Sequence, residues 1–215
     1  MDRKLINWLG LTGMIAFISY TLAVVISPSA FPGYNWMEQA VSDLSADSAP
    51  SRMLWNRLAA FYGICSVVCP TCVSVRISEK PVSTRLFRVG MHLFTAMSWV
   101  SGIGYTMFPL ADSGKEIASF QEIMHIIVTA AVVLLSVVSL VCLIAAGFRK
   151  GGIRGIGIWA AAALVLMLIG AIGQKAVPPQ YFGVTERFSV FAAVGFTAVC
   201  GLYLFSDFTE KRFRA

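Results

Sequence analysis

Residues 123–148 read IMHIIVTAAVVLLSVVSLVCLIAAGF, a run of 26 residues whose only titratable side chains are His125 and Cys142. An α-helix needs about 20 apolar residues to cross the hydrocarbon core of a bilayer. Outward from this run, five more segments meet or nearly meet that length. The six predicted helices are residues 5–26, 58–75, 89–107, 123–148, 156–172 and 188–205. The sequence therefore predicts an all-α fold, a polytopic membrane helix bundle with six transmembrane helices, in a single domain over residues 1–215.

The composition supports the same class of protein. Of the 215 residues 57% are hydrophobic and 13% are charged, whereas a soluble domain usually carries about 25% charged residues. The net charge of +6 does not indicate a nucleic-acid partner, because no basic run alternates with aromatic residues. The apolar run 5–26 exceeds the roughly 7–15 residues of a signal-peptide core, so we expect a retained first helix, with cleavage after Ala30 as the alternative.

The basic residues predict the orientation in the cell membrane. Loops that stay in the cytoplasm carry an excess of lysine and arginine. With cytoplasmic N- and C-termini, the outer segments hold only five of the 17 basic residues, which are Arg52, Arg57, Lys115, Lys175 and Arg187. The twelve others fall inside: Arg3, Lys4, Arg76, Lys80, Arg85, Arg88, Arg149, Lys150, Arg154, Lys211, Arg212 and Arg214.

The first outer loop is the longest and contains FPGYNWMEQAVSDLSADSAPSR at residues 31–52. Within it, Trp36, Ala40 and Leu44 recur at a helical spacing and define one apolar stripe. This pattern predicts a short interfacial helix over residues 36–44, packed over the mouth of the bundle.

Polar and titratable side chains gather at the outer ends of the predicted helices. Ionisable groups in a membrane are costly to bury, and are therefore functional candidates. The candidates are Tyr34, Glu38, Ser42 and Asp43 in the loop, Glu122 and His125 at the start of the fourth helix, and Glu186 and Arg187 at the start of the sixth. A purely structural role is the competing interpretation: His125 bonded to a loop carbonyl, Glu122 favouring a helix start, and Arg187 paired with Asp43 or Glu186.

Three functions are compatible with these residues. The first is a non-catalytic binding or interaction protein, which is a lipid sensor, a partner subunit or an assembly factor. In its lipid-binding form it has a cavity, open to the outer leaflet, that binds a membrane lipid or another amphiphile. Its predicted ligand-binding residues are Arg187, Tyr34, Glu38 and Glu122.

The second is a hydrolase or transferase acting on a lipid, with His125 as general acid or base. Asp43 or Glu186 would orient this histidine, and Ser42 would be the nucleophile. The third is a transporter, which predicts a polar track from His125 toward His92; against it, five of the six helices lack ionisable groups at mid-membrane.

No cofactor or metal is expected. His92 and His125 begin their helices on opposite sides of a membrane about 30 Å thick, and no histidine pair has ligand spacing. The Cys69–Cys72 spacing resembles a redox motif, but cysteines within apolar helices are usually packing residues. No sequence feature indicates an oligomeric state.

The order of these motifs resembles a known family. YNWMEQAVSDLSA at residues 34–46, GIGYTMFP at residues 102–109, His125, and the Glu186–Arg187–Phe188 run resemble domain of unknown function 998, a family of six-helix bacterial and archaeal membrane proteins. The resemblance covers nearly the whole chain and implies the topology above but no activity. The matching polar positions are Tyr34, Ser42, Asp43, Pro109, His125, Glu186 and Arg187; Ser45 replaces a frequent glycine.

A more distant similarity is to membrane hydrolases that include alkaline ceramidases. They also place serine, aspartate and histidine groups near one membrane face. This chain lacks their paired HxxxH zinc ligands, so the similarity does not extend to a zinc mechanism.

Overall fold

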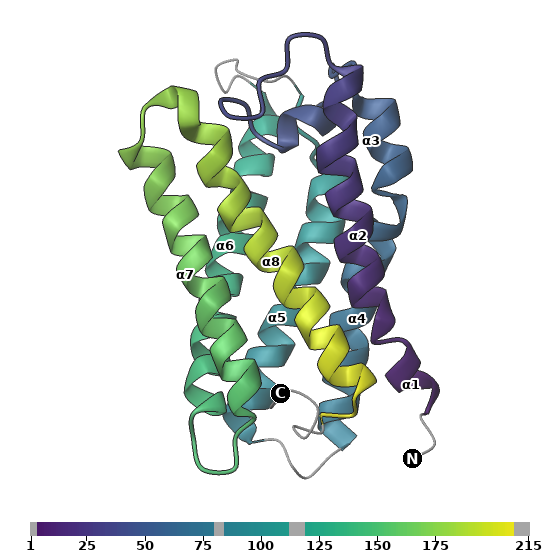
Figure 1. The fold of residues 1–215 in the computed structure, drawn as a ribbon, viewed down its shortest axis with the longest axis vertical. Helices are drawn as coiled ribbons and strands as arrows, with labels where there is room; N and C mark the ends of the chain where they lie inside the picture. Colours follow the sequence, from purple (N-terminus) through teal and green to yellow (C-terminus); the bar gives the residue numbers. More distant parts are fainter. Residues whose placement is uncertain (1–3, 80–83, 112–118, 209–215) are drawn as a thin grey trace.

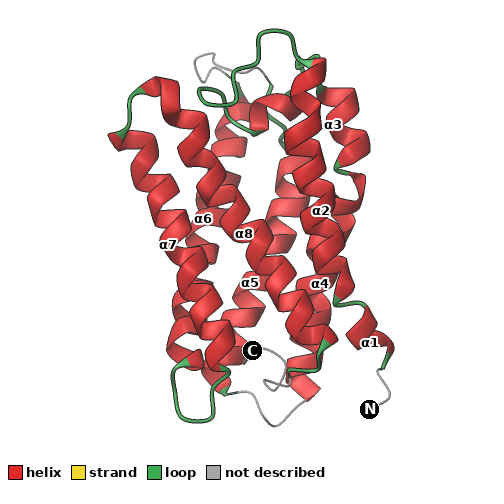
Figure 2. Cartoon of the chain, in the orientation of Figure 1, coloured by secondary structure: helices red, strands yellow, loops and turns green. Residues whose placement is uncertain are grey.

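The computed structural model describes residues 4–79, 84–111 and 119–208. Within these ranges the chain forms helices joined by turns and contains no strand (Figure 2). Six helices are long: α2 (Leu11–Ile26), α4 (Ala60–Glu79), α5 (Arg85–Met107), α6 (Phe120–Gly147), α7 (Arg154–Ala176) and α8 (Phe182–Phe205). The short elements are α1 (Leu5–Trp8), α3 (Arg52–Leu58) and the 3₁₀ turns η1 (Ser27–Ala30), η2 (Ser42–Ser45) and η3 (Pro179–Tyr181).

The long helices form a closed ring. Each packs against the next in the sequence, α8 packs against α2, and α4 also contacts α8 (Figure 1). The crossing of α2 and α8 is close, because a Cβ atom on Gly10 would collide with the carbonyl oxygen of Gly201. The side chain of Asn7 in α1 donates to the carbonyl oxygen of Leu204 at 2.8 Å. This end of the bundle, with α1 and the C-terminal end of α8, is called the terminal end; the opposite end, with residues 27–51, is the loop end.

The helices agree with the predicted segments but differ at their starts. The predicted helix at 188–205 begins six residues earlier, at Phe182, so Glu186 and Arg187 lie in the second turn of α8. The predicted helix at 58–75 runs over Ala60–Glu79 and is preceded by the separate helix α3.

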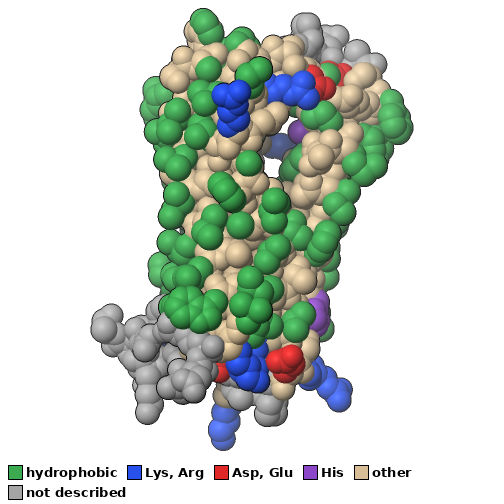
Figure 3. All heavy atoms as spheres, turned by 90° about the vertical axis from the view of Figure 1, so that its right-hand side faces the viewer, with side chains coloured by type: hydrophobic (Ala, Val, Ile, Leu, Met, Phe, Trp, Pro, Cys, Tyr) green, Lys and Arg blue, Asp and Glu red, His purple; other side chains and the backbone are tan. Residues whose placement is uncertain are grey.

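The exterior of the bundle is apolar. Among the residues that the structure describes, five segments are long and apolar enough to cross a membrane: Leu5–Ala30, Ala60–Glu79, Phe120–Gly147, Arg154–Ala176 and Pro179–Phe205. Helix α5 has 23 residues but is less apolar than these five. In Figure 3, hydrophobic side chains cover the middle of one face, and the charged side chains lie near its two ends. Such a surface suits hydrocarbon rather than water, and the chain is an α-helical membrane protein.

The two ends of the bundle are packed differently. The larger apolar core joins α4, α5, α6, α7 and α8, and large buried members such as Phe87, Met91, Leu143 and Tyr203 lie toward the terminal end. At the loop end the buried cluster is small: Tyr20, Val24, Val41 and Val194. The face in Figure 3 is hollowed in its upper half, where a histidine and a basic side chain are visible. The loop end is therefore less completely filled by large apolar side chains than the terminal end.

The helix expected over residues 36–44 does not form. The segment makes turns followed by the 3₁₀ turn η2 at Ser42–Ser45. The physical reason is that side-chain oxygens take the backbone N–H groups that a helix would use. These bonds are Met37 N to Asn35 Oδ1 at 3.1 Å, Ala40 N to Asp43 Oδ2 at 3.0 Å and Val41 N to Glu186 Oε2 at 2.8 Å.

Candidate functional site

The first loop lies directly on the start of α8. The backbone N–H of Val184 donates to the carbonyl oxygen of Met37 at 3.2 Å. A Cβ atom on Gly183 would collide with the carbonyl oxygens of Trp36 and Gln39. Glycine at this position therefore permits the loop backbone to approach the helix this closely.

One helical turn beyond Gly183, Arg187 holds the loop in place. Its Nη1 donates to the carbonyl oxygens of Trp36 at 2.7 Å, Gly183 at 2.8 Å and Gln39 at 3.1 Å. Its Nη2 donates to the hydroxyl of Tyr34 at 2.8 Å. One side chain thus satisfies acceptors from three positions of the loop and one of its own helix.

Tyr34 extends this arrangement into the loop. Its hydroxyl accepts from Arg187 and donates to the carbonyl oxygen of Ala40 at 2.7 Å. Burial raises the pKa of the Tyr34 phenol above its ordinary value, although the neighbouring Arg187 charge opposes this shift. The phenol is therefore protonated at neutral pH and serves as both donor and acceptor.

The positive charge of Arg187 has no carboxylate partner among the described residues. The structural interpretation of the sequence paired it with Asp43 or Glu186, and neither carboxylate is within ion-pair distance. Glu186 precedes Arg187 on α8 but points elsewhere and accepts the N–H of Val41. In the described part of the chain, the Nε–H of Arg187 and its second Nη2–H have no protein acceptor.

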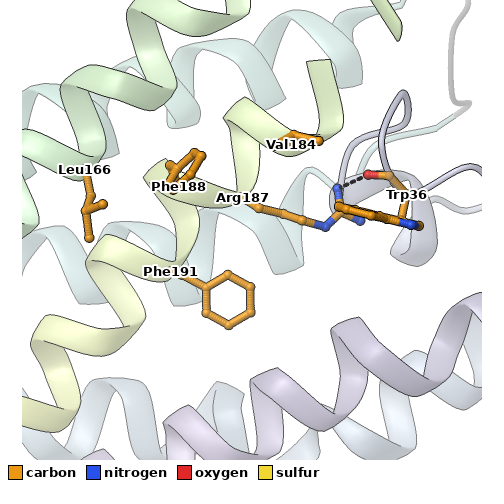
Figure 4. A pocket seen from close by; sticks show the side chains of 6 residues that line it. All are labelled: Trp36, Leu166, Val184, Arg187, Phe188 and Phe191. Carbon is orange, nitrogen blue, oxygen red and sulfur yellow. Dashed lines mark hydrogen bonds between the residues drawn. The ribbon is translucent and has the colours of Figure 1, made fainter. Parts of the chain in front are cut away.

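An apolar pocket of about 290 Å³ begins at this arginine. Its lining is Trp36 from the loop, Leu166 from α7, and Val184, Arg187, Phe188 and Phe191 from α8 (Figure 4). Phe188 is 41% exposed, so the pocket opens on the outside of the bundle between α7 and α8. The guanidinium carbon of Arg187 lies 5.9 Å from the centre of the Trp36 ring, so these two residues place a charge and an indole at the rim.

Aromatic packing inside the bundle supports the pocket. The Phe191 ring meets that of Tyr20 edge to face, with their centres 5.8 Å apart. Tyr20 in turn packs on Tyr62 and Trp55 at 4.7 Å and 5.7 Å. The pocket wall is therefore braced from within by side chains of α2, α3 and α4.

A second, polar groove of about 680 Å³ lies beside the same contact between the loop and α8. It is lined by Gly33, Asn35, Glu38, Gln39, Ala40, Ser42, Asp43 and Phe182. Asp43 is buried, while Glu38 is exposed and accepts weakly from Asn35 at 3.4 Å. Within the described ranges, no group of three or more His, Cys, Asp or Glu side chains is arranged to hold a metal ion.

His125 is held at a different contact, between α5 and α6. Its Nδ1 is 2.9 Å from the carbonyl oxygen of Phe108, and its ring lies 5.0 Å from that of Tyr105. Because a carbonyl oxygen only accepts, Nδ1 is the donor. Ser42, Asp43 and Glu186 are not among the hydrogen-bonding partners of this ring in the described structure.

Glu122 has a structural role at the start of α6. Its carboxylate accepts the backbone N–H of Ser119 at 2.9 Å, and the Ser119 hydroxyl accepts the N–H of Glu122 at 3.2 Å. This reciprocal pair is a capping box. Glu122 is therefore engaged at the helix start and does not line either of the two pockets above.

The loop end thus joins Tyr34, Asp43, Glu186 and Arg187 through the loop–α8 contact, with Glu38 and Ser42 beside it. The sequence reasoning missed Trp36, Gly183 and the pocket residues Leu166, Phe188 and Phe191. Gly183 lies four residues before Arg187, one turn away on the same helix face, and this spacing was an available signal. Pocket-lining leucine and phenylalanine carry no such signal in an apolar helix.

The family resemblance is confirmed. The model of a family described as "Protein of unknown function (DUF998)" matches residues 14–203, so the chain belongs to this family. No curated protein and no solved structure gives a significant match. The distant similarity to membrane hydrolases stays a prediction.

Proposed function

We propose that this member of the DUF998 family binds a membrane amphiphile at the loop end of its bundle. The apolar part of the ligand occupies the pocket between α7 and α8, and the polar part meets Arg187 and Trp36 at the rim. The observation that carries this proposal is a single pocket with an apolar interior and a cationic rim. Such a pocket suits a molecule with one apolar and one polar end.

We propose that the loop end lies outside the cell membrane and the terminal end in the cytoplasm. Helix α5 is then the sixth membrane-spanning helix. The described basic residues support this orientation: Lys4, Arg76, Arg85, Arg88, Arg149, Lys150 and Arg154 lie toward the terminal end. Arg3, Lys80, Lys115, Lys211, Arg212 and Arg214 are outside the described residues. In this orientation the pocket faces the outer leaflet.

The contacts favour binding over lipid hydrolysis. A catalytic histidine needs a free nitrogen near its nucleophile and an orienting carboxylate. His125 donates Nδ1–H to the carbonyl oxygen of Phe108, which leaves Nε2 available, but no serine or carboxylate of the described chain bonds to its ring. Transport is not favoured either, because the polar side chains buried within the long helices α4 to α8 of the described chain are uncharged hydroxyls, at Ser74, Ser98, Ser136, Ser139, Thr185 and Thr197.

The test is mass spectrometry of the lipids that co-purify with the full chain. Leu166→Trp fills the pocket from α7, and Leu168→Trp is its control, because Leu168 is 44% exposed on the same helix and does not line the pocket. We expect the wild type and Leu168→Trp to retain one amphiphile above its level in the membrane. Leu166→Trp should lose that amphiphile about tenfold, equivalent to about 1.4 kcal/mol. Profiles that match the bulk membrane in all three proteins would contradict the proposal.

A further inference from the structure

We infer that the ligand of this pocket is an anionic amphiphile that places one apolar chain in the pocket and whose phosphate or carboxylate headgroup binds Arg187. This inference rests on the proposed function and specifies the ligand class. It follows from the charge of the rim, the unused donors of Arg187 and the size of the pocket.

The charge of Arg187 is solvated by neutral groups only. Its four acceptors are three backbone carbonyls and one phenol, and no carboxylate of the described chain lies within 4.0 Å. Glu186 interacts with Arg187 electrostatically but is not in ion-pair contact with it. Beside apolar walls the local dielectric is low, so a guanidinium with unused N–H donors attracts an anion. A ligand with a negative headgroup supplies a carboxylate or phosphate in direct contact with these donors.

The terminal end of the bundle contains an arginine that is paired with a carboxylate. Arg76 binds the Asp207 carboxylate through Nε at 2.9 Å and through Nη2 at 3.2 Å. At Arg187, the Nε–H and one Nη2–H have no acceptor among the described residues. These two nitrogens are the ones that Arg76 uses for its carboxylate, and such a fork matches two oxygens of a phosphate or carboxylate.

The size of the pocket limits the apolar part. One water molecule occupies about 30 Å³ in the liquid, so 290 Å³ accommodates on the order of ten groups of that size. This volume suits one alkyl chain, and any second chain of the ligand would lie outside the pocket, because the pocket opens on the outside of the bundle. The Trp36 ring, 54% exposed at the rim, suits the boundary between headgroup and chain, where indoles are favoured in membranes.

The experiment compares probes that share one chain and differ in headgroup. The full chain is placed in phosphatidylcholine nanodiscs, and binding is measured by native mass spectrometry for dodecyl phosphate, uncharged dodecyl maltoside, cationic dodecyltrimethylammonium and inorganic phosphate. We expect dodecyl phosphate to bind about tenfold more tightly than either other amphiphile, and inorganic phosphate to bind weakly.

The variants separate charge from loop anchoring. Arg187→Gln should abolish the preference for dodecyl phosphate, and Arg187→Lys should retain part of it. Gly183→Ala shifts the loop but keeps the charge of Arg187, so it should weaken the binding of all three amphiphiles alike; this variant controls for loosening of the loop. Leu166→Trp should weaken the binding of all three amphiphiles.

Each outcome bears on one of the two claims. Equal binding of the three amphiphiles, all weakened by Leu166→Trp, would overturn the anionic ligand and leave the proposed function intact. Failure of every amphiphile to bind, or binding that Leu166→Trp does not change, would overturn the proposed function itself. Inorganic phosphate binding as tightly as dodecyl phosphate would identify a free anion rather than a lipid and overturn the inference.

Discussion

Arg187 and Trp36 are joined twice: the Nη1 of Arg187 lies 2.7 Å from the carbonyl oxygen of Trp36, and its guanidinium carbon lies 5.9 Å from the centre of the Trp36 ring. The same pair fastens the first loop to α8 and forms the rim of the apolar pocket. Loop position and pocket shape are therefore coupled through one arginine, and variants that move the loop are expected to alter the pocket.

Gly183→Ala is expected to loosen the loop. The added methyl group meets the carbonyl oxygens of Trp36 and Gln39, so the loop must shift, at a cost of about 1–3 kcal/mol. Thermal unfolding of the purified protein and protease cleavage within the loop provide the measurements. Gly63→Ala on α4 is the control, because its Cβ atom would meet nothing within 4 Å. Equal unfolding temperatures for the two variants would contradict the close loop–helix contact.

Tyr34→Phe is expected to destabilise the protein by about 1 kcal/mol, the usual contribution of one hydrogen bond. The change leaves an Nη2–H of Arg187 and the carbonyl oxygen of Ala40 without their partner. Chemical unfolding is the measurement, and Tyr181→Phe is the control, because Tyr181 is 43% exposed and its hydroxyl makes no hydrogen bond in the described structure. No difference between the two variants would show that the Tyr34 hydroxyl contributes nothing.

The Tyr34 contact should depend on pH only at high pH. Because burial raises the Tyr34 pKa above the ordinary 10.0, its stabilising contribution is fully present below pH 10 and is lost as pH rises through the folded-state pKa. The stability difference between wild type and Tyr34→Phe should therefore stay constant from pH 7 to pH 9 and shrink above pH 10. A difference that already falls between pH 7 and pH 9 would contradict a buried, protonated phenol.

Arg76→Gln tests the ion pair at the terminal end. The side chains of Arg76 and Asp207 are 11% and 16% exposed, so removal of the cation leaves a poorly solvated carboxylate. We expect a loss of about 1–3 kcal/mol, measured by unfolding, and a smaller further loss on adding Asp207→Asn. Arg85→Gln is the control, because Arg85 is exposed at the start of α5 and makes no ion pair in the described chain. Additive effects of the two changes would contradict the pairing.

His125→Ala is expected to change stability but not the chemical form of any bound lipid. The variant loses the bond to the carbonyl oxygen of Phe108, while the loop–α8 contact and the pocket are unchanged. Mass spectrometry of co-purifying lipids is the measurement, with His92→Ala, at an exposed position of α5, as the control. An intact lipid that accumulates only on His125→Ala, with its hydrolysis product on wild type, would restore the catalytic hypothesis.

The sequence was sufficient for the positions of the long helices and for the end of the bundle at which the polar candidate residues gather. Both depend on local signals, namely apolar length and the positions of charged residues. The loop was harder to predict, because the apolar spacing of Trp36, Ala40 and Leu44 is helical, whereas the backbone of this segment bonds to Glu186 and Arg187, about 150 positions away. The Glu186 carboxylate and the Arg187 guanidinium reach the loop only once the chain has folded.

The partners of Arg187 could not be predicted for a related reason. Sequence indicates which carboxylates are available for an arginine, and Asp43 and Glu186 were the nearest candidates. Three of the four actual acceptors are backbone carbonyls, which every residue carries and no sequence pattern marks. Tyr34 was the one partner that its residue type made visible.

The most direct test of binding in the pocket between α7 and α8 is to locate a bound amphiphile on the protein. A dodecyl phosphate that carries a photoreactive diazirine near its chain end is crosslinked to the full chain in nanodiscs, and the modified residues are identified by mass spectrometry. We expect adducts on Leu166, Phe188 and Phe191, which line the pocket, and their loss in Leu166→Trp. Adducts spread over lipid-facing residues such as Ile64 and Leu134, with none at the pocket, would contradict binding in this pocket.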